Sequence, residues 1–238
     1  MNNYYFKILS FVSSLRFGSI RSFLLDIVLP RFWARELEVI RNTQGVPVNK
    51  FLISTLEKSE RAVLVEEIIR YGEFSSLIEI GAAYGQNFDI LARVFPKVNF
   101  VGVDIDIDSV KIANRDNKFS NVEYHFGSGA DLRFLEHGSF DIAIMSAVSL
   151  YLDDNDLNSI IEQLQKKGVK KIFLLEMHDE SADKTFLVEE SDRPPYFLRN
   201  YEELFKARRL DYKKIKISNP IWTIERWSDL ATLFVVSL

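Results

Sequence analysis

Blocks of apolar residues separated by polar ones predict a compact alternation of strand and helix over residues 75–108. A short apolar run over residues 77–80 has the length of a buried strand, and a second run over residues 100–103 ends at Asp104. Between them, residues 88–95 carry apolar side chains at helical spacing and are followed by a proline. The pattern therefore predicts a strand, a glycine-containing turn, a helix and a second strand, which together form half of a nucleotide-binding βαβ unit.

The same alternation extends through the rest of the chain. Apolar spacing predicts helices over residues 50–72, over 109–114 after a cap at Asp108 or Ser109, after a cap between 153 and 156, and over 196–208. Short β-prone runs predict strands over residues 121–126, 140–146, 170–177, 212–217 and 230–238. The order of these elements is that of an α/β fold.

The turn after the first strand has the residues that a close ligand contact needs. Gly81 allows a sharp change of direction, and the small residues Ala83 and Gly85 leave the main chain open to a ligand. The helix that follows begins with backbone N–H groups that have no partner within the helix. Asp104 ends the second strand, where a carboxylate can accept two hydrogen bonds from a ribose diol.

The spacing of this turn separates two classes of cofactor. A dinucleotide needs the pattern G-x-G-x-x-G, and no third glycine stands where the pyrophosphate would lie. Glu79 places a negative charge two residues before the first glycine, which would repel a phosphate but suits an ammonium group. Two alternatives stay open: a βαβ unit without a ligand, and a nicotinamide cofactor.

The segment from Glu79 to Gly85 resembles the first motif of the class I S-adenosylmethionine-dependent methyltransferases, with Ala83 in place of the middle glycine. The resemblance implies a three-layer Rossmann-like fold with a mostly parallel seven-stranded sheet and an antiparallel last strand. It also implies that Glu79 lies near the methionine part of the cofactor, that Asp104 binds the ribose, and that Ser128 stands where relatives often carry an acid for the adenine. The residues implied to bind S-adenosylmethionine are Glu79, Gly81, Ala82, Ala83, Gly85, Asp104, Ile105, Ser128, Gly129 and Ser146.

The resemblance further implies methyl transfer by in-line displacement to a small molecule or a saccharide, with oxygen as the expected acceptor atom. The fourth strand is not followed by an Asn-Pro-Pro-Tyr motif, which disfavours transfer to base or glutamine nitrogen. His178 is the candidate catalytic base because its ordinary pKa suits proton transfer near neutral pH, with a surface histidine beside acids as the alternative and Tyr151 as a second candidate base. Arg193 and Arg199 are expected to be solvated, with anion binding as the alternative. No metal site is expected, because the three histidines lack ligand spacing and the fourth strand ends in Ser146 rather than an acid.

Composition adds information about the surroundings of this domain. The net charge of −4 gives no overall basic signature for nucleic acid. The absence of cysteine excludes disulfides and is compatible with the cytoplasm. Residues 1–35 differ from the remainder, because they hold five basic residues, one acid and many aromatic side chains.

We expect an N-terminal helical extension over residues 1–50 and a cofactor-binding domain over residues 51–238. The extension has no apolar stretch long enough to span a membrane, because charged residues interrupt it. It could roof the crevice of the domain, or it could contact an anionic membrane or a second copy of the chain. The predicted location is thus cytoplasmic, with membrane association through residues 1–35 as an option.

Three functions are compatible with these patterns: a catalytic methyltransferase, a non-catalytic partner subunit with the same fold, and an NAD(P)-dependent oxidoreductase. The antiparallel finish that the last two strands predict is typical of the first two.

Overall fold

The computed structural model describes residues 60–135, 139–183, 185–188, 196–217 and 229–238. The chain divides into two units, Met1–Tyr71 and Gly72–Leu238. Of the first unit, the structure describes helix α4 (Glu60–Tyr71), so the predicted extension and its boundary at residue 50 lie outside the described residues. None of the described helices is long and apolar enough to cross a membrane.

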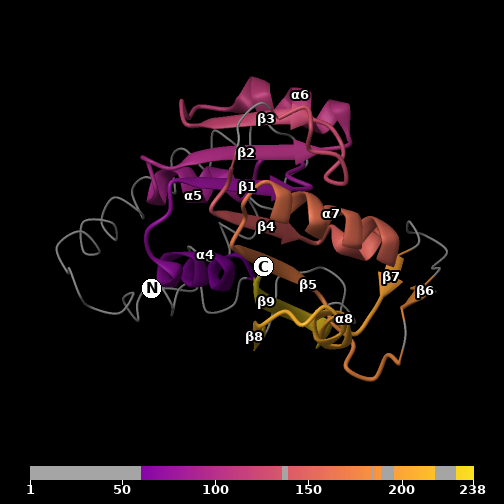
Figure 1. Cartoon of the computed structure of the whole chain (residues 1–238). Helices are drawn as coiled ribbons and strands as arrows, with labels where there is room; N and C mark the ends of the chain where they lie inside the picture. Colours follow the sequence, from indigo (N-terminus) through magenta and orange to yellow (C-terminus); the bar gives the residue numbers. More distant parts are fainter. Residues whose placement is uncertain (1–59, 136–138, 184, 189–195, 218–228) are drawn as a thin grey trace, which may run out of the picture. The chain divides into compact units, whose positions relative to one another are not determined.

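The second unit is built on a seven-stranded sheet in the order β3-β2-β1-β4-β5-β9-β8 (Figure 1). Strands β1 to β5 are parallel, and β9 lies antiparallel between β5 and β8. This arrangement confirms the predicted sheet with its antiparallel last strand. The strands are β1 (Ser76–Ile80), β2 (Asn99–Asp104), β3 (Val122–Phe126), β4 (Ile142–Ser146), β5 (Lys171–Met177), β8 (Tyr212–Lys216) and β9 (Ala231–Ser237).

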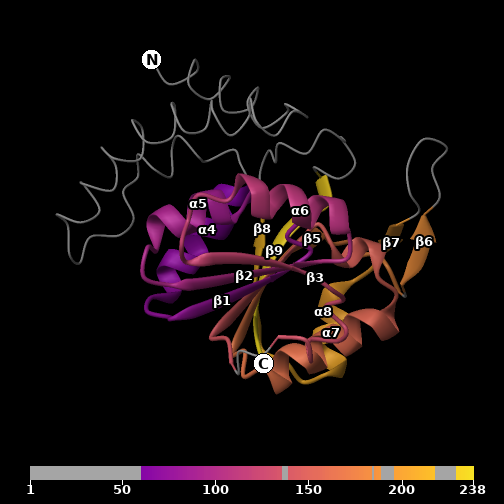
Figure 2. The ribbon, with the colours of Figure 1, turned by 90° about the horizontal axis from the view of Figure 1, so that it is seen from above.

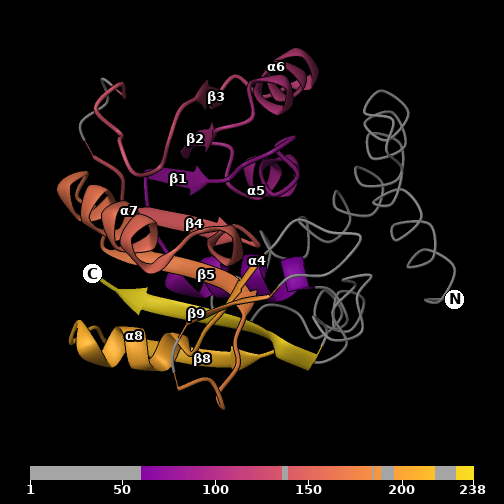
Figure 3. The ribbon, with the colours of Figure 1, turned by 90° about the vertical axis from the view of Figure 1, so that its right-hand side faces the viewer.

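Helices cover both faces of the sheet in the second unit (Figures 2 and 3). One face carries α5 (Phe88–Val94) and α6 (Ile107–Asp116), and the other carries α7 (Asp154–Lys166) and α8 (Tyr201–Ala207). Because successive strand residues point to opposite faces, β2 sends Phe100 towards Phe88 of α5 and Val101 into the core under α7. Burial on both faces explains why the central strands are continuous apolar runs.

Two predicted boundaries are wrong. Residues 196–198 form strand β7 (Tyr196–Leu198), which pairs with β6 (Phe186–Val188) in a separate two-stranded sheet. The helix begins only at Tyr201, because the Asn200 side chain accepts hydrogen bonds from the first backbone N–H groups of α8. Likewise, α6 is capped by Asp106 rather than by Asp108 or Ser109, since its carboxylate accepts the Asp108 N–H and the Ser109 hydroxyl.

Asp141 fastens the start of β4 to the start of β1. Its Oδ2 accepts hydrogen bonds from Ser75 N at 2.8 Å, Ser75 Oγ at 2.7 Å and Ser76 N at 3.2 Å. These donors, with the Ser75 backbone N–H first, hold the pKa of Asp141 at about 2, below its ordinary 3.8. Because the pKa is lower in the folded protein, the bonds stabilise it fully above about pH 4, and the contribution is lost as the pH falls through about 2.

We therefore expect Asp141→Ala to lower the free energy of unfolding at pH 7 by about 2 kcal/mol, the scale of hydrogen bonds to a partly exposed charged group. Urea denaturation at pH 7 and at pH 3 measures this, and the difference between variant and wild type is expected to shrink at pH 3. Asp131→Ala is the control. The pKa of Asp131 is also about 2, but its partner Arg133 is only two residues away in the sequence, and the Arg133 side chain is 86% exposed. Equal losses in the two variants would contradict the tie between β1 and β4.

Candidate functional site

The turn after β1 is held tightly against the end of β2. Gly81 N and Ala82 N both donate to Val103 O, at 2.8 and 3.2 Å, and Gly85 N donates to Ala82 O at 2.8 Å. Gly81, Ala83 and Gly85 have φ values of +76°, +46° and +77°. The loop thus adopts the left-handed conformation at every second residue, which explains the small residues at these positions.

Asp104 is joined to this loop. Its Oδ2 accepts the Ala83 N–H at 2.7 Å, and its Oδ1 accepts the Asp106 N–H at 2.8 Å. Each carboxylate oxygen can accept a further hydrogen bond, so both retain capacity for a ligand hydroxyl. The two predicted elements, loop and strand-end acid, therefore form one surface at the carboxyl ends of β1 and β2.

Glu79 lies beneath the same loop and is 2% exposed. Asn87 Nδ2 donates to Glu79 Oε1 across the turn. Asn87 is the N-cap residue directly before α5 but makes no side-chain cap, because its amide is directed to Glu79 instead. The sequence pattern did not identify Asn87; an asparagine just before a helix is ordinarily explained as a cap.

The opposite side of the surface comes from the segments after β2 and β3. Ile105 is 73% exposed, which leaves an apolar side chain in solvent next to Asp104. The loop after β3 is tied to β2 through Gly127 N, which donates to Asp104 O at 2.9 Å. Within that loop the Ser128 hydroxyl accepts the Ala130 N–H at 3.2 Å, and Gly129 packs against Ile80 of the core.

The sequence patterns did not identify two exposed aromatic side chains at this edge. Phe126 ends β3 with 56% of its surface exposed, and Phe134 is 41% exposed with its ring against Gly127. Both side chains lie close to Gly127, whose N–H is bonded to Asp104 O. Alternation along β3 alone could not separate an outward-facing from an inward-facing phenylalanine.

The end of β4 borders the loop from the other side. Ser146 ends this strand next to β1, and Ala147 follows with a φ of +54°. Val148 then packs directly on Gly81: a Cβ atom added at Gly81 would lie 1.8 Å from Val148 Cγ2. Any side chain at Gly81 is therefore excluded by sterics as well as by backbone conformation.

A buried polar network lies behind the turn at Val148. Glu176 of β5 is fully buried, and its Oε1 accepts Val148 N at 2.8 Å and Ser149 N at 2.7 Å. Burial raises the pKa of Glu176 to about 7, with the hydrogen bonds and the nearby Arg199 charge opposing that rise. The Ser149 hydroxyl in turn lies 2.6 Å from the Tyr201 hydroxyl.

The expectation that Arg199 is solvated is wrong, because its side chain is 2% exposed. Its guanidinium donates to Leu152 O through Nη2, and Nη1 lies 3.6 Å from Asp154 Oδ1. It also lies over the Tyr201 ring, 5.7 Å from the centroid. The pairing of β7 with β6 explains the burial, since this unpredicted sheet packs β7 against the 3₁₀ turn Ser149–Tyr151. Arg193 lies outside the described residues.

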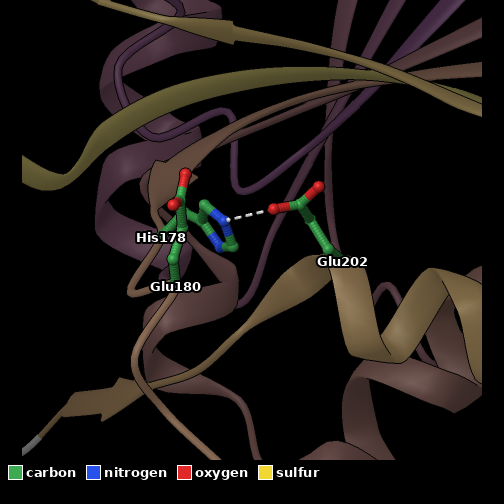
Figure 4. A group of neighbouring side chains, drawn as sticks. All are labelled: His178, Glu180 and Glu202. Atoms are coloured by element: carbon green, nitrogen blue, oxygen red, sulfur yellow. Dashed lines mark hydrogen bonds and ion pairs between the residues drawn. The ribbon is translucent and has the colours of Figure 1, made fainter.

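His178 directly follows β5, and its ring faces Glu202 of α8 (Figure 4). Its ring is 2% exposed, Nδ1 accepts the Tyr201 N–H at 3.3 Å, and Nε2 lies 3.3 Å from Glu202 Oε2. Burial lowers the pKa of His178 below its ordinary 6.5, so the ring is neutral at pH 7 and Nε2 carries the proton shared with Glu202. The single lone pair is then committed to the backbone. These contacts favour a structural role, and the catalytic role of His178 stays a prediction.

His178, Glu180 and Glu202 could by distance alone hold a metal ion, since their ligand atoms lie within 4.8 Å of one another. The Lys214 ammonium, however, donates to Glu180 Oε1 at 2.7 Å and to Glu202 Oε2 at 2.6 Å. The cation that these two acids need is therefore supplied by the chain itself, and we assign no metal to this cluster.

Known proteins resemble this chain in sequence profile and in fold. The family profile of a methyltransferase domain matches residues 77–168. No curated protein sequence matches the chain.

Several solved structures share the fold. The glycopeptide N-methyltransferase MtfA, solved with S-adenosyl-L-methionine, has a TM-score of 0.58 at 11% identity over 76% of this chain and 94% of that one. The PH0226 protein from Pyrococcus horikoshii OT3 has a TM-score of 0.56 at 18% identity over 77% and 89%. The N-terminal domain of EvdMO1, solved with S-adenosylhomocysteine, has a TM-score of 0.55 at 16% identity over 76% and 81%.

The loop geometry, the sheet order and the profile match agree with one another. Residues 77–168 match the profile of a methyltransferase domain, and the chain has the fold of the S-adenosylmethionine-dependent methyltransferases.

Proposed function

We propose that this domain binds S-adenosylmethionine at the carboxyl ends of β1 and β2 and transfers its methyl group to an oxygen of a small molecule or saccharide. The observation that carries the proposal is the pairing of Asp104 with the loop: the Ala83 N–H orients a carboxylate whose remaining lone pairs suit the two ribose hydroxyls. The positive-φ residues beside it leave a main-chain surface without side chains.

The remaining predicted residues support distinct parts of the same ligand. Ile105 offers an exposed apolar side chain for the adenine, and Ser128 and Gly129 directly follow Gly127, whose N–H donates to Asp104 O. Glu79, held by Asn87, gives the buried end of the site a negative charge that suits the ammonium and sulfonium groups. When bound, the cofactor supplies an electrophilic methyl group; the chain orients it and keeps the crevice shaped for a neighbouring acceptor.

The absence of an Asn-Pro-Pro-Tyr motif after β4 supports oxygen over nitrogen as the acceptor atom, since Ser146 is followed by Ala147 and Val148. The residue that takes the proton from such a hydroxyl remains to be assigned, because the lone pair of His178 is already used.

Isothermal calorimetry with S-adenosylhomocysteine and, separately, with NAD tests the cofactor. We expect saturable binding of S-adenosylhomocysteine with a Kd in the micromolar range, about −8 kcal/mol, and no saturable binding of NAD at the same concentrations. The reverse preference would overturn the proposal in favour of an oxidoreductase.

Turnover with isotope-labelled S-adenosylmethionine and a panel of small-molecule and sugar alcohols and amines tests the acceptor. Transfer to hydroxyl compounds is expected. Exclusive labelling of amines would refute the acceptor atom while leaving the cofactor assignment intact.

A further inference from the structure

We propose that Glu176 is a positioning residue for cofactor binding: its buried carboxylate fixes the turn at Val148 and Ser149, and Val148 in turn fixes the glycine loop at Gly81. The inference rests on the proposed function, because the loop matters only if a cofactor lies against it. Glu176 itself is fully buried and touches the loop only through Val148.

The first link joins Glu176 to the turn. One carboxylate oxygen, Oε1, accepts two consecutive backbone N–H groups, from Val148 and Ser149, at 2.8 and 2.7 Å. These two N–H groups follow Ala147, whose φ of +54° points the chain away from the strand. A turn with this unfavourable backbone conformation persists only where its surroundings determine it, and Glu176 Oε1 supplies a buried acceptor for both of its N–H groups.

The second link joins the turn to the loop. The Val148 side chain fills the space beside the Gly81 α carbon, since a Cβ atom there would be 1.8 Å from Cγ2 and 3.0 Å from Cβ of Val148. Gly81 in turn donates its N–H to Val103 O, next to Asp104. A shift of the Val148 turn therefore changes the support of the loop on which the ribose-binding acid depends.

Two further buried side chains, Tyr201 and Arg199, lie next to Ser149 and Glu176. The Ser149 hydroxyl lies 2.6 Å from the buried Tyr201 hydroxyl, and the buried Arg199 guanidinium places a positive charge near Glu176. Among the residues that the structure describes, Glu176 Oε2 and Arg199 Nε have no hydrogen-bond partner. Oε1 is thus the carboxyl oxygen that holds the backbone of the turn.

The test compares Glu176→Ala, Glu176→Gln and Val148→Ala by S-adenosylhomocysteine calorimetry, with urea denaturation to verify that each variant is folded under the conditions used. Glu176→Ala leaves two N–H groups without an acceptor, and we expect its Kd to rise about tenfold or more. Glu176→Gln retains Oε1 as an acceptor and is expected to stay within about threefold of wild type. Rescue by glutamine separates loss of the hydrogen bonds from loss of the charge.

A double-mutant cycle tests whether Glu176 acts through Val148. If it does, Glu176→Ala combined with Val148→Ala binds S-adenosylhomocysteine no more weakly than Glu176→Ala alone, because both changes release the same contact. Thr232→Val is the matched control: Thr232 faces Glu176 in the register of β5 and β9, is 3% exposed, and donates to Leu230 O rather than to the turn. The Kd of Thr232→Val for S-adenosylhomocysteine is expected to match that of wild type, even if the variant is less stable.

The outcomes separate the two proposals. If wild type fails to bind S-adenosylhomocysteine, the proposed function is wrong. If wild type binds it and folded Glu176→Ala binds equally well, or if the effects of the two variants add, the positioning role of Glu176 is wrong while the function stands.

Discussion

Gly81→Ala is expected to weaken cofactor binding strongly and to destabilise the domain more than Gly72→Ala does. The new Cβ would lie 1.8 Å from Val148 Cγ2, and the φ of +76° disfavours any side chain. Overpacking and left-handed backbone strain together cost about 3 kcal/mol. To relieve this overlap the loop must move, and a shift of about 1 Å is expected to weaken S-adenosylhomocysteine binding about a hundredfold.

Gly72→Ala is the matched control for this substitution. Gly72 also has a positive φ, +97°, but a Cβ atom there would meet no atom within 4 Å. It is therefore expected to cost only the backbone strain, about 1 kcal/mol, and to leave the affinity unchanged. Calorimetry and urea denaturation of both variants measure the difference. Equal affinity in Gly81→Ala and Gly72→Ala would show that the loop does not contact the cofactor.

The clash at Gly81 also predicts a partial rescue. Combining Gly81→Ala with Val148→Ala removes Cγ2, the atom in closest overlap, and leaves the tight 3.0 Å approach to the Cβ atom of residue 148. The stability of the double variant is expected to exceed that of Gly81→Ala alone, because relief of overlap outweighs the lost apolar contact. A double variant that is less stable than Gly81→Ala would contradict the packing of Val148 on the loop.

Asp104→Ala is expected to raise the Kd of S-adenosylhomocysteine between about tenfold and a hundredfold, the range for losing charge-assisted hydrogen bonds in a binding site. Two effects combine: the ribose hydroxyls lose their acceptor, and the N–H groups of Ala83 and Asp106 lose the carboxylate that orients them. Calorimetry with S-adenosylhomocysteine measures the total.

Comparison with the 2′-deoxy analogue isolates the ribose contribution. Wild type is expected to prefer the natural ligand, whereas Asp104→Ala is expected to lose most of this preference. Asp108→Ala is the control, because Asp108 lies close in sequence with a side chain that is 79% exposed and pairs with Lys111. An Asp104→Ala variant that still prefers the natural ligand over the 2′-deoxy analogue would show that Asp104 does not bind the ribose.

The cofactor half of the site could be predicted from the sequence because its determinants are local. The strand, the glycine turn, the helix and the acid at the next strand end follow each other within residues 76–104, so periodicity and spacing place them without long-range information. Asp104 meets the loop because parallel neighbouring strands end at the same edge of a sheet. The bond of its carboxylate to Ala83 N–H is the structural detail that this reasoning did not supply.

The surroundings of Arg199 and His178 could not be predicted in the same way, because their contacts come from residues distant in the chain. Arg199 is buried only because β7 pairs with β6 and packs on the turn after β4, and the apolar residues of this segment also fitted a helix. His178 loses its free lone pair to the backbone of Tyr201, 23 residues away. Sequence patterns record which side chains can titrate, whereas burial and partners decide whether they do.

The sequence by itself thus determined the strands, the helices and the loop-and-acid pair, since hydrophobic periodicity and glycine placement act over a few residues, and the family resemblance added the seven-stranded sheet with its antiparallel last strand. Tertiary structure alone decided that Glu176 supports the Val148 turn and that Val148 closes on Gly81, because these contacts join β5, the end of β4 and the end of β1 across gaps of 28 and 67 residues. Only the packed sheet brings such residues within hydrogen-bond and van der Waals distance.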